Sequence, residues 1–473
     1  MNDSPAPEQK PPPGRWRWVK RIVAAVFVGL VCGCAWVFVA HERVRSEGEH
    51  ELTEVRAEVV ATDPDWTWEK LNAARKEPPV GKNGAELVPQ IKALIAPEWG
   101  QAFTQVEFSS RLDPVPNVRF PPDILIQARR ELKASADAVR LARQLKDRPT
   151  GYREIELAPV FTGTMLVDTQ NTRLVADLLR WDVVIATEDD DIRRAADSLL
   201  ALLNASRSIG DEPLFISQLV RMAVRSVAVR YTELALAQSP SFPLSELQAG
   251  FEADAEEPLL LYGTRGERAA LDRLFENLQT GVVPLEEVLG APPKNLWGWQ
   301  DNAHLPMDRA IALRRMTACV EAARRPLHEQ AAAFAAIPEP PADPHLVISG
   351  ATLSTAENVA QAFWRTSAQA RCAVVGIACE RFRQQYRRWP ASLAALVPAF
   401  LPAVPLDPYT GEPLRFAKLE AGAVVYSVGS DRRSDGGTLD APSGTQPRFR
   451  LWNPDQRRRT AQPTPPPERE PAP

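Results

Sequence analysis

The chain has 473 residues, of which 44% are hydrophobic and 25% charged, and its formal net charge is −4. This length predicts two or three globular units with linkers, and the composition excludes a chain that is disordered throughout. The small net charge excludes a general attraction to nucleic acid, so we expect no nucleic-acid partner. The 44 prolines predict extended connections, since ordinary usage is about 5%.

An apolar run near the start, residues 22–40 (IVAAVFVGLVCGCAWVFVA), has 19 residues without a charge. At about 1.5 Å per residue it nearly matches a hydrocarbon core of roughly 30 Å, so we expect a transmembrane helix whose partner is the lipid bilayer. Four basic residues precede it: Arg15, Arg17, Lys20 and Arg21. The positive-inside rule then predicts a cytoplasmic tail at residues 1–21 and the bulk of the chain outside the cytoplasm, at the inner membrane.

Two alternatives for the apolar run stay open. A cleaved signal peptide usually has a shorter apolar region and a small-x-small cleavage pattern, whereas this run exits through VFVAHER. A lipoprotein site at Cys34 has a suitable Gly33 before it, but apolar residues continue beyond it. We favour the uncleaved anchor.

The remainder predicts a mainly α protein with a small α+β module at its C-terminal end. Residues 41–120 predict a stalk, a linker and entry helices, and residues 121–340 a domain of helical hairpins. These hairpins resemble tetratricopeptide-type or other α-solenoids in architecture, without a repeating 34-residue signature. Within the domain, Asp211 is placed to cap a helix that starts near Glu212-Pro213.

Residues 350–452 change character from helix to strand. A helix is predicted from Thr355 to Arg387, followed by strands in LRFAKL and AVVYSV with a turn at residues 420–422. This pattern offers one strand face, made of Leu414, Phe416, Val424, Tyr426 and Val428. Residues 453–473 are rich in proline and charge, which predicts a disordered tail.

Local signatures of catalysis are missing from the sequence. The five histidines are scattered, no CxxC pair occurs among the five cysteines, and GxSxG, GxxxxGK[ST] and GxGxxG are absent. Acidic residues 189–191 stand at a predicted helix start, where the helix dipole favours negative charge. We therefore assign no catalytic residue and no organic cofactor.

Three features follow one another near the C-terminus: RQQYRRWPASLAALVP, PLDPYTGEPLRF and VVYSVGSDRRSDGGTLD. Their order resembles the C-terminal half of the type II secretion major pseudopilin (general secretion pathway protein G), and similar endings occur in other bacterial membrane-anchored proteins with a helical middle. The resemblance covers residues 355–440. The Gly-Phe cleavage step and the glutamate that begin true pseudopilins are missing here, so prepilin processing and filament assembly are not implied.

The resemblance implies a calcium loop after the second strand. Its ligands map onto Asp431 and Asp440, Asp435 is a further carboxylate without a clear counterpart, and a carbonyl near Val428 would complete the shell. Two arginines in this loop oppose a cation. The alternative, which we favour, is a solvated or self-hydrogen-bonded Asp-Gly turn.

These observations favour a membrane-anchored structural or protein-interaction protein of the bacterial envelope, with a protein partner there and a connection to secretion as a further possibility. The alternative is an envelope hydrolase with a site between the helical and C-terminal domains, which predicts convergent polar groups with shifted pKa values in a cleft.

Overall fold

The computed structural model describes residues 15–101, 115–239, 241–289, 302–339, 343, 346–434, 436–439 and 446–460. These residues are mostly helical and contain one small antiparallel sheet, as the sequence predicts. The helices are α1 (Arg15–Thr62), α2 (Trp68–Ala74), α3 (Leu87–Leu94), α5 (Pro122–Ala134), α6 (Ala136–Arg143), α7 (Val167–Glu188), α8 (Ile192–Arg207), α9 (Phe215–Gln238), α10 (Ser245–Ala255), α11 (Leu259–Gln279), α12 (Leu285–Leu289), α13 (Leu305–Arg324), α14 (Leu327–Ala335) and α15 (Val347–Tyr386). The strands are β1 (Arg415–Leu419), β2 (Gly422–Tyr426) and β3 (Arg448–Trp452).

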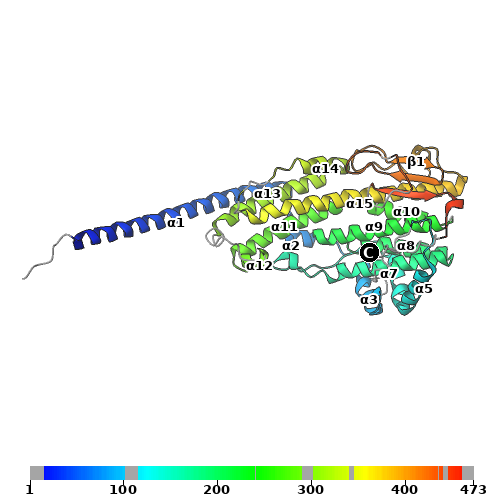
Figure 1. Cartoon of the computed structure of the whole chain (residues 1–473), viewed down its shortest axis with the longest axis horizontal. Coiled ribbons are helices and arrows are strands. Elements are labelled where there is room, and N and C mark those ends of the chain that lie inside the picture. Colours follow the sequence, from blue (N-terminus) through cyan, green and yellow to red (C-terminus); the bar gives the residue numbers. More distant parts are fainter. Residues whose placement is uncertain are drawn as a thin grey trace, which may run out of the picture.

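Helix α1 projects from one end of an elongated body, and the sheet lies at the opposite end (Figure 1). The helix is continuous for 48 residues, about 72 Å at the usual rise, and it includes the whole predicted span. Large apolar side chains such as Val23, Phe27 and Phe38 are at least 60% exposed along this segment. It is the one helix among the described residues that is long and apolar enough to cross a membrane.

The second half of α1 packs onto the body instead of forming a free stalk. Leu52, Val55 and Val59 recur at helical spacing and are buried against Ala310 and Leu313 of α13. The change from an exposed apolar surface to a buried stripe divides α1 into a lipid-compatible half and a docking half.

Ion pairs reinforce this docking at the end of α1. Asp63 accepts hydrogen bonds from Arg265 and Arg268 of α11, with an Oδ1 distance of 2.6 Å to Arg265 Nη2. Arg324 Nη2 of α13 lies 3.2 Å from the same carboxylate. Burial raises the pKa of Asp63, but the hydrogen bonds and charges of Arg265 and Arg268 reverse this and hold the pKa below its usual range.

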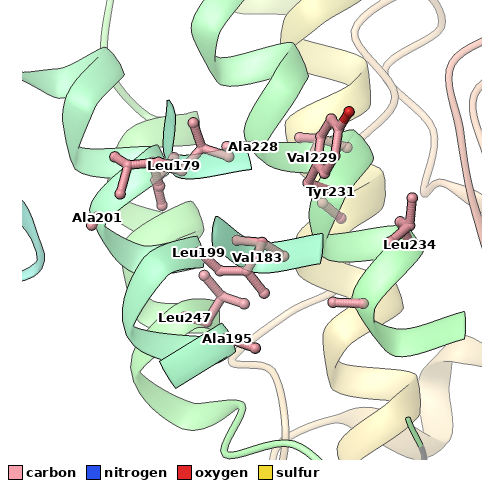
Figure 2. Packing of buried hydrophobic residues seen from close by; sticks show 14 of the residues in the cluster. Leu179, Val183, Ala195, Leu199, Ala201, Ala228, Val229, Tyr231, Leu234 and Leu247 are labelled. Atoms are coloured by element: carbon pink, nitrogen blue, oxygen red, sulfur yellow. The ribbon is translucent and has the colours of Figure 1, made fainter. Parts of the chain in front are cut away.

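The core of the body is built on antiparallel helices. Apolar side chains of α7, α8, α9 and α10 interdigitate around Leu199 and Val183, both completely buried (Figure 2). The same cluster continues to Ala373 of α15 and to Phe449 of β3. Helix α15 therefore joins the helical body to the sheet. The boundaries predicted between the stalk, the helical domain and the C-terminal module stay a prediction.

The sheet has the order β1-β2-β3, and both neighbouring pairs are antiparallel. The β1 and β2 predictions are confirmed, whereas β3 was not predicted. The predicted strand face is wrong, because the turn has two residues and pairs Leu419 with Gly422. Phe416 consequently lies opposite Val425, and Val424 and Tyr426 point to the other face.

Three further predictions need correction. Helix α9 begins at Phe215 after Leu214 without a side-chain cap, while Asp211 pairs with Arg75 at 2.9 Å. Helix α15 starts eight residues before the predicted Thr355. Residues 453–460 pack on the body, where buried Arg457 lies 2.9 Å from Glu380, although disorder was predicted from residue 453. Residues 461–473 lie outside the described residues.

Candidate anion-binding cleft

A cleft of about 540 Å³ lies where α14 and α15 meet two segments of the C-terminal module. Those segments are the turn that contains Asp407-Pro408 and the loop that follows β2. The cleft lies at the junction between the helical domain and the C-terminal module, where the hydrolase alternative predicts its site. Its volume is within the range of about 300 to 1,000 Å³ that is typical of ligand pockets.

One face of α15 supplies the first wall. Asn358, Gln361, Ala362 and Arg365 follow the i, i+3, i+4, i+7 spacing that places side chains on one side of a helix. Buried Trp364 lies beside them, and its Nε1 donates to Gln330 Oε1 at 3.1 Å. This bond and the packing of the ring fix the apolar part of the wall.

Buried hydrogen bonds to Asp407 hold the second wall of the cleft together. Its buried Oδ1 accepts hydrogen bonds from Tyr409 N and Ser427 Oγ, both at 2.9 Å. Its Oδ2 accepts from Val428 N, also at 2.9 Å. One carboxylate therefore joins the Asp-Pro turn to the start of the loop after β2.

The loop after β2 supplies Gly429, Ser430 and Arg432 to the cleft. Gly429 has φ of 72° and Arg432 has φ of 55°, the left-handed conformation that tightens the turn. The Arg432 N–H donates to Gly429 O at 3.2 Å. Gln446 Nε2 donates to the Arg433 carbonyl at 2.7 Å, which fixes the far side of the loop.

Tyr409 stays protonated in this setting. Burial raises the pKa of Tyr409 to about 12 and the nearby Asp407 carboxylate acts in the same direction, while Arg365 opposes them. Its hydroxyl is therefore a neutral donor at physiological pH.

The cleft is cationic. Arg365 and Arg432 line it, both side chains are exposed, and neither forms an ion pair with a described residue. No aspartate, glutamate or histidine is among the described residues that line it. This combination can hold an anion through guanidinium groups. Besides the two arginines, Tyr409 is the titratable group among the described residues that line the cleft.

The calcium prediction falls only partly within the described residues. Asp431 is exposed, and its Oδ1 accepts from Arg433 N at 3.1 Å, as in the self-hydrogen-bonded turn that we favoured. Asp435 and Asp440 lie outside the described residues. Among the described residues, no group of three or more His, Cys, Asp or Glu could hold a metal. The calcium site stays a prediction.

Sequence reasoning missed Asp407 and Arg365. Asp407 stands in an Asp-Pro-x-x-Gly turn, and a polar residue at such a position is a signal for an Asx-type turn. The bonds to Ser427 and Val428 are long-range contacts that local spacing does not reveal. Arg365 is one of several arginines on α15, so only the tertiary arrangement distinguishes it.

Comparisons of the chain with protein-family models, with curated proteins and with solved structures give no match.

Proposed function

We propose that the chain is an inner-membrane protein that presents its body outside the cytoplasm and binds another protein of the bacterial envelope. The observation that carries this proposal is the division of α1 into an exposed apolar half and a half docked on the body. A helix of this kind attaches the body to a bilayer without a flexible joint. The basic residues before the span favour the orientation with the N-terminus inside.

Binding is better supported than hydrolysis. The hydrolase alternative predicts convergent polar groups with shifted pKa values in the cleft. Among the described residues that line the cleft, Tyr409 alone has a shifted pKa. Burial raises the pKa of Glu267 to about 7 and also raises the pKa of Asp308, but neither residue lines the cleft. Asp308 instead accepts hydrogen bonds from Ile348 N and Ser349 N at the start of α15, which is a structural role.

We infer further that residues from α15 to β3 form a module similar to the C-terminal half of the type II secretion major pseudopilin. The order of a long helix, a Trp389-Pro390 step, the Asp407-Pro408 turn and a strand hairpin supports this. A calcium-dependent rise in melting temperature that Asp431→Ala abolishes would support the loop site. Its absence in millimolar calcium would remove that part of the proposal.

The interaction proposal is tested by photo-crosslinking in intact cells that produce the full chain. A crosslinking residue in place of Gln361, which lines the cleft, is compared with one in place of the fully exposed Val80. We expect a discrete adduct with one protein from position 361 and none from position 80. No adduct from position 361, or the same adducts from both positions, would contradict the proposal.

A further inference from the structure

The two arginines of the cleft differ in their ion pairing from arginines that stabilise the body. Arg265, Arg309 and Arg450 each pair with a carboxylate from another segment of the chain. Arg365 and Arg432 come from separate elements, line the same cleft and have no such partner among the described residues. A guanidinium group presents planar paired donors that match a carboxylate, so the vacant pairing capacity points to a carboxylate ligand.

The uncharged polar groups of the cleft are also unengaged. The side chains of Asn358, Gln361 and Tyr409 line it and form no side-chain hydrogen bond with the described chain. Each amide offers both donors and an acceptor, which is the set that a peptide backbone requires. Trp364 and Ala331 add apolar surface for the rest of a ligand.

A phosphate group fits these residues less well than a peptide. The amide oxygens of Asn358 and Gln361 need donors, which a phosphate ester does not supply and peptide N–H groups do. Helix α15 starts at Val347, three turns before Asn358, so its N-terminus does not point into the cleft. In the loop, the N–H groups of Gly429, Arg432 and Arg433 already donate within the loop.

We propose that this cleft binds an extended acidic peptide segment of the protein partner, with two carboxylates on Arg365 and Arg432 and the backbone on Asn358 and Gln361. The inference deepens the proposed function and rests on it for the existence of a partner. The site is preorganised because Asp407 and Gln446 fix the two module segments that form its second wall.

The test is a binding titration with full-length protein in detergent or nanodiscs. The probes are a fluorescent capped peptide with two alternating glutamates (AEAEA), its isosteric glutamine counterpart (AQAQA) and inorganic phosphate. The variants are Arg365→Gln, Arg432→Gln and, as a matched control, Arg433→Gln. Arg433 is the next residue of the same loop, is exposed, and does not line the cleft. Melting curves check that each variant folds.

We expect the glutamate peptide to bind at least tenfold more tightly than the glutamine peptide, with an affinity that falls as salt rises. Arg365→Gln and Arg432→Gln should each weaken binding at least fivefold, and Arg433→Gln less than twofold. If a variant misfolds, Asn358→Ala, an exposed truncation on the same wall, should weaken peptide binding without changing the melting temperature.

Three results would overturn the inference: equal affinity for both peptides, an equal loss in Arg433→Gln, or binding of phosphate without binding of the peptide. These outcomes leave the membrane topology untouched. Failure of the proposed topology, in turn, would not alter the titration, so peptide binding and membrane topology are tested separately.

Discussion

Asp407 accepts hydrogen bonds from three donors in two segments that are about twenty residues apart in the chain. Replacement by asparagine keeps one acceptor oxygen but turns an NH₂ group toward donors, which leaves buried groups unsatisfied. We expect Asp407→Asn to lower the stability of the C-terminal module by about 2 to 4 kcal/mol. Thermal melting of the purified full chain measures the loss.

Asp431→Asn is the control for this substitution, since Asp431 is exposed and accepts a single backbone N–H. It should cost less than about 1 kcal/mol. Equal melting temperatures for the two variants would show that Asp407 does not hold the segments together.

Glu267 makes stability depend on pH. It accepts a hydrogen bond from Phe215 N at 3.2 Å, and burial raises its pKa from 4.5 to about 7. The folded state therefore binds the Glu267 proton more tightly than the unfolded state does. The stability that this proton contributes is fully present below pH 4.5 and is lost as pH rises through 7. Glu267→Gln keeps the acceptor and removes the charge.

The variant should consequently be more stable than the parent chain at pH 8, by roughly 1 to 3 kcal/mol, and nearly equal to it at pH 4.5. Melting curves across this interval provide the comparison. A difference that does not change with pH would contradict the assignment.

Among the elements, α1 and α13 approach closely at Gly48. A Cβ atom at this position would lie 2.7 Å from Met307 N and 3.2 Å from Pro306 Cβ. Gly48→Ala should therefore weaken the docking of α1, with a net loss of about 1 to 2 kcal/mol after the gain in helix propensity of about 1 kcal/mol.

Gly29→Ala is the matched control, because a Cβ there would have no described atom within 4 Å. Only the Gly48 variant should melt at a lower temperature in detergent. If both variants melt like the parent chain, the close packing of α1 and α13 at Gly48 does not contribute to stability, and the prediction is wrong.

The elements also show which parts of the fold the sequence could predict. The span and the hairpin strands depend on local patterns, and both were predicted. The face on which a strand residue lies depends on the length of the turn. The sequence predicted a three-residue turn, whereas the turn has two residues, so Val424 was assigned to the wrong face of the sheet. Strand β3 contains two arginines, and one of them, Arg450, is buried through contact with Glu233 of α9, a long-range pairing without a local signature.

Helices α1 and α15 set the long dimension of the molecule. The start of α15 is capped by Asp308 of α13, close to where α1 docks, and its 40 residues extend about 60 Å toward the sheet. A body attached through α1 would thus hold the sheet away from the bilayer (Figure 1). The sequence predicted the anchor, but the docking of residues 48–62 depends on tertiary contacts that periodicity does not specify.

Cysteine labelling in spheroplasts directly measures how the body is oriented across the membrane. The native background is low, since Cys32 and Cys34 lie in the predicted span and Cys319, Cys372 and Cys379 are fully buried. Glu420 is exposed in the β1–β2 turn, and Ser4 belongs to the N-terminal tail. A membrane-impermeant maleimide should label Glu420→Cys before lysis and Ser4→Cys only after permeabilisation. Labelling of Ser4→Cys before lysis, with Glu420→Cys protected, would contradict the proposal that the N-terminus is cytoplasmic and the body lies outside the cytoplasm.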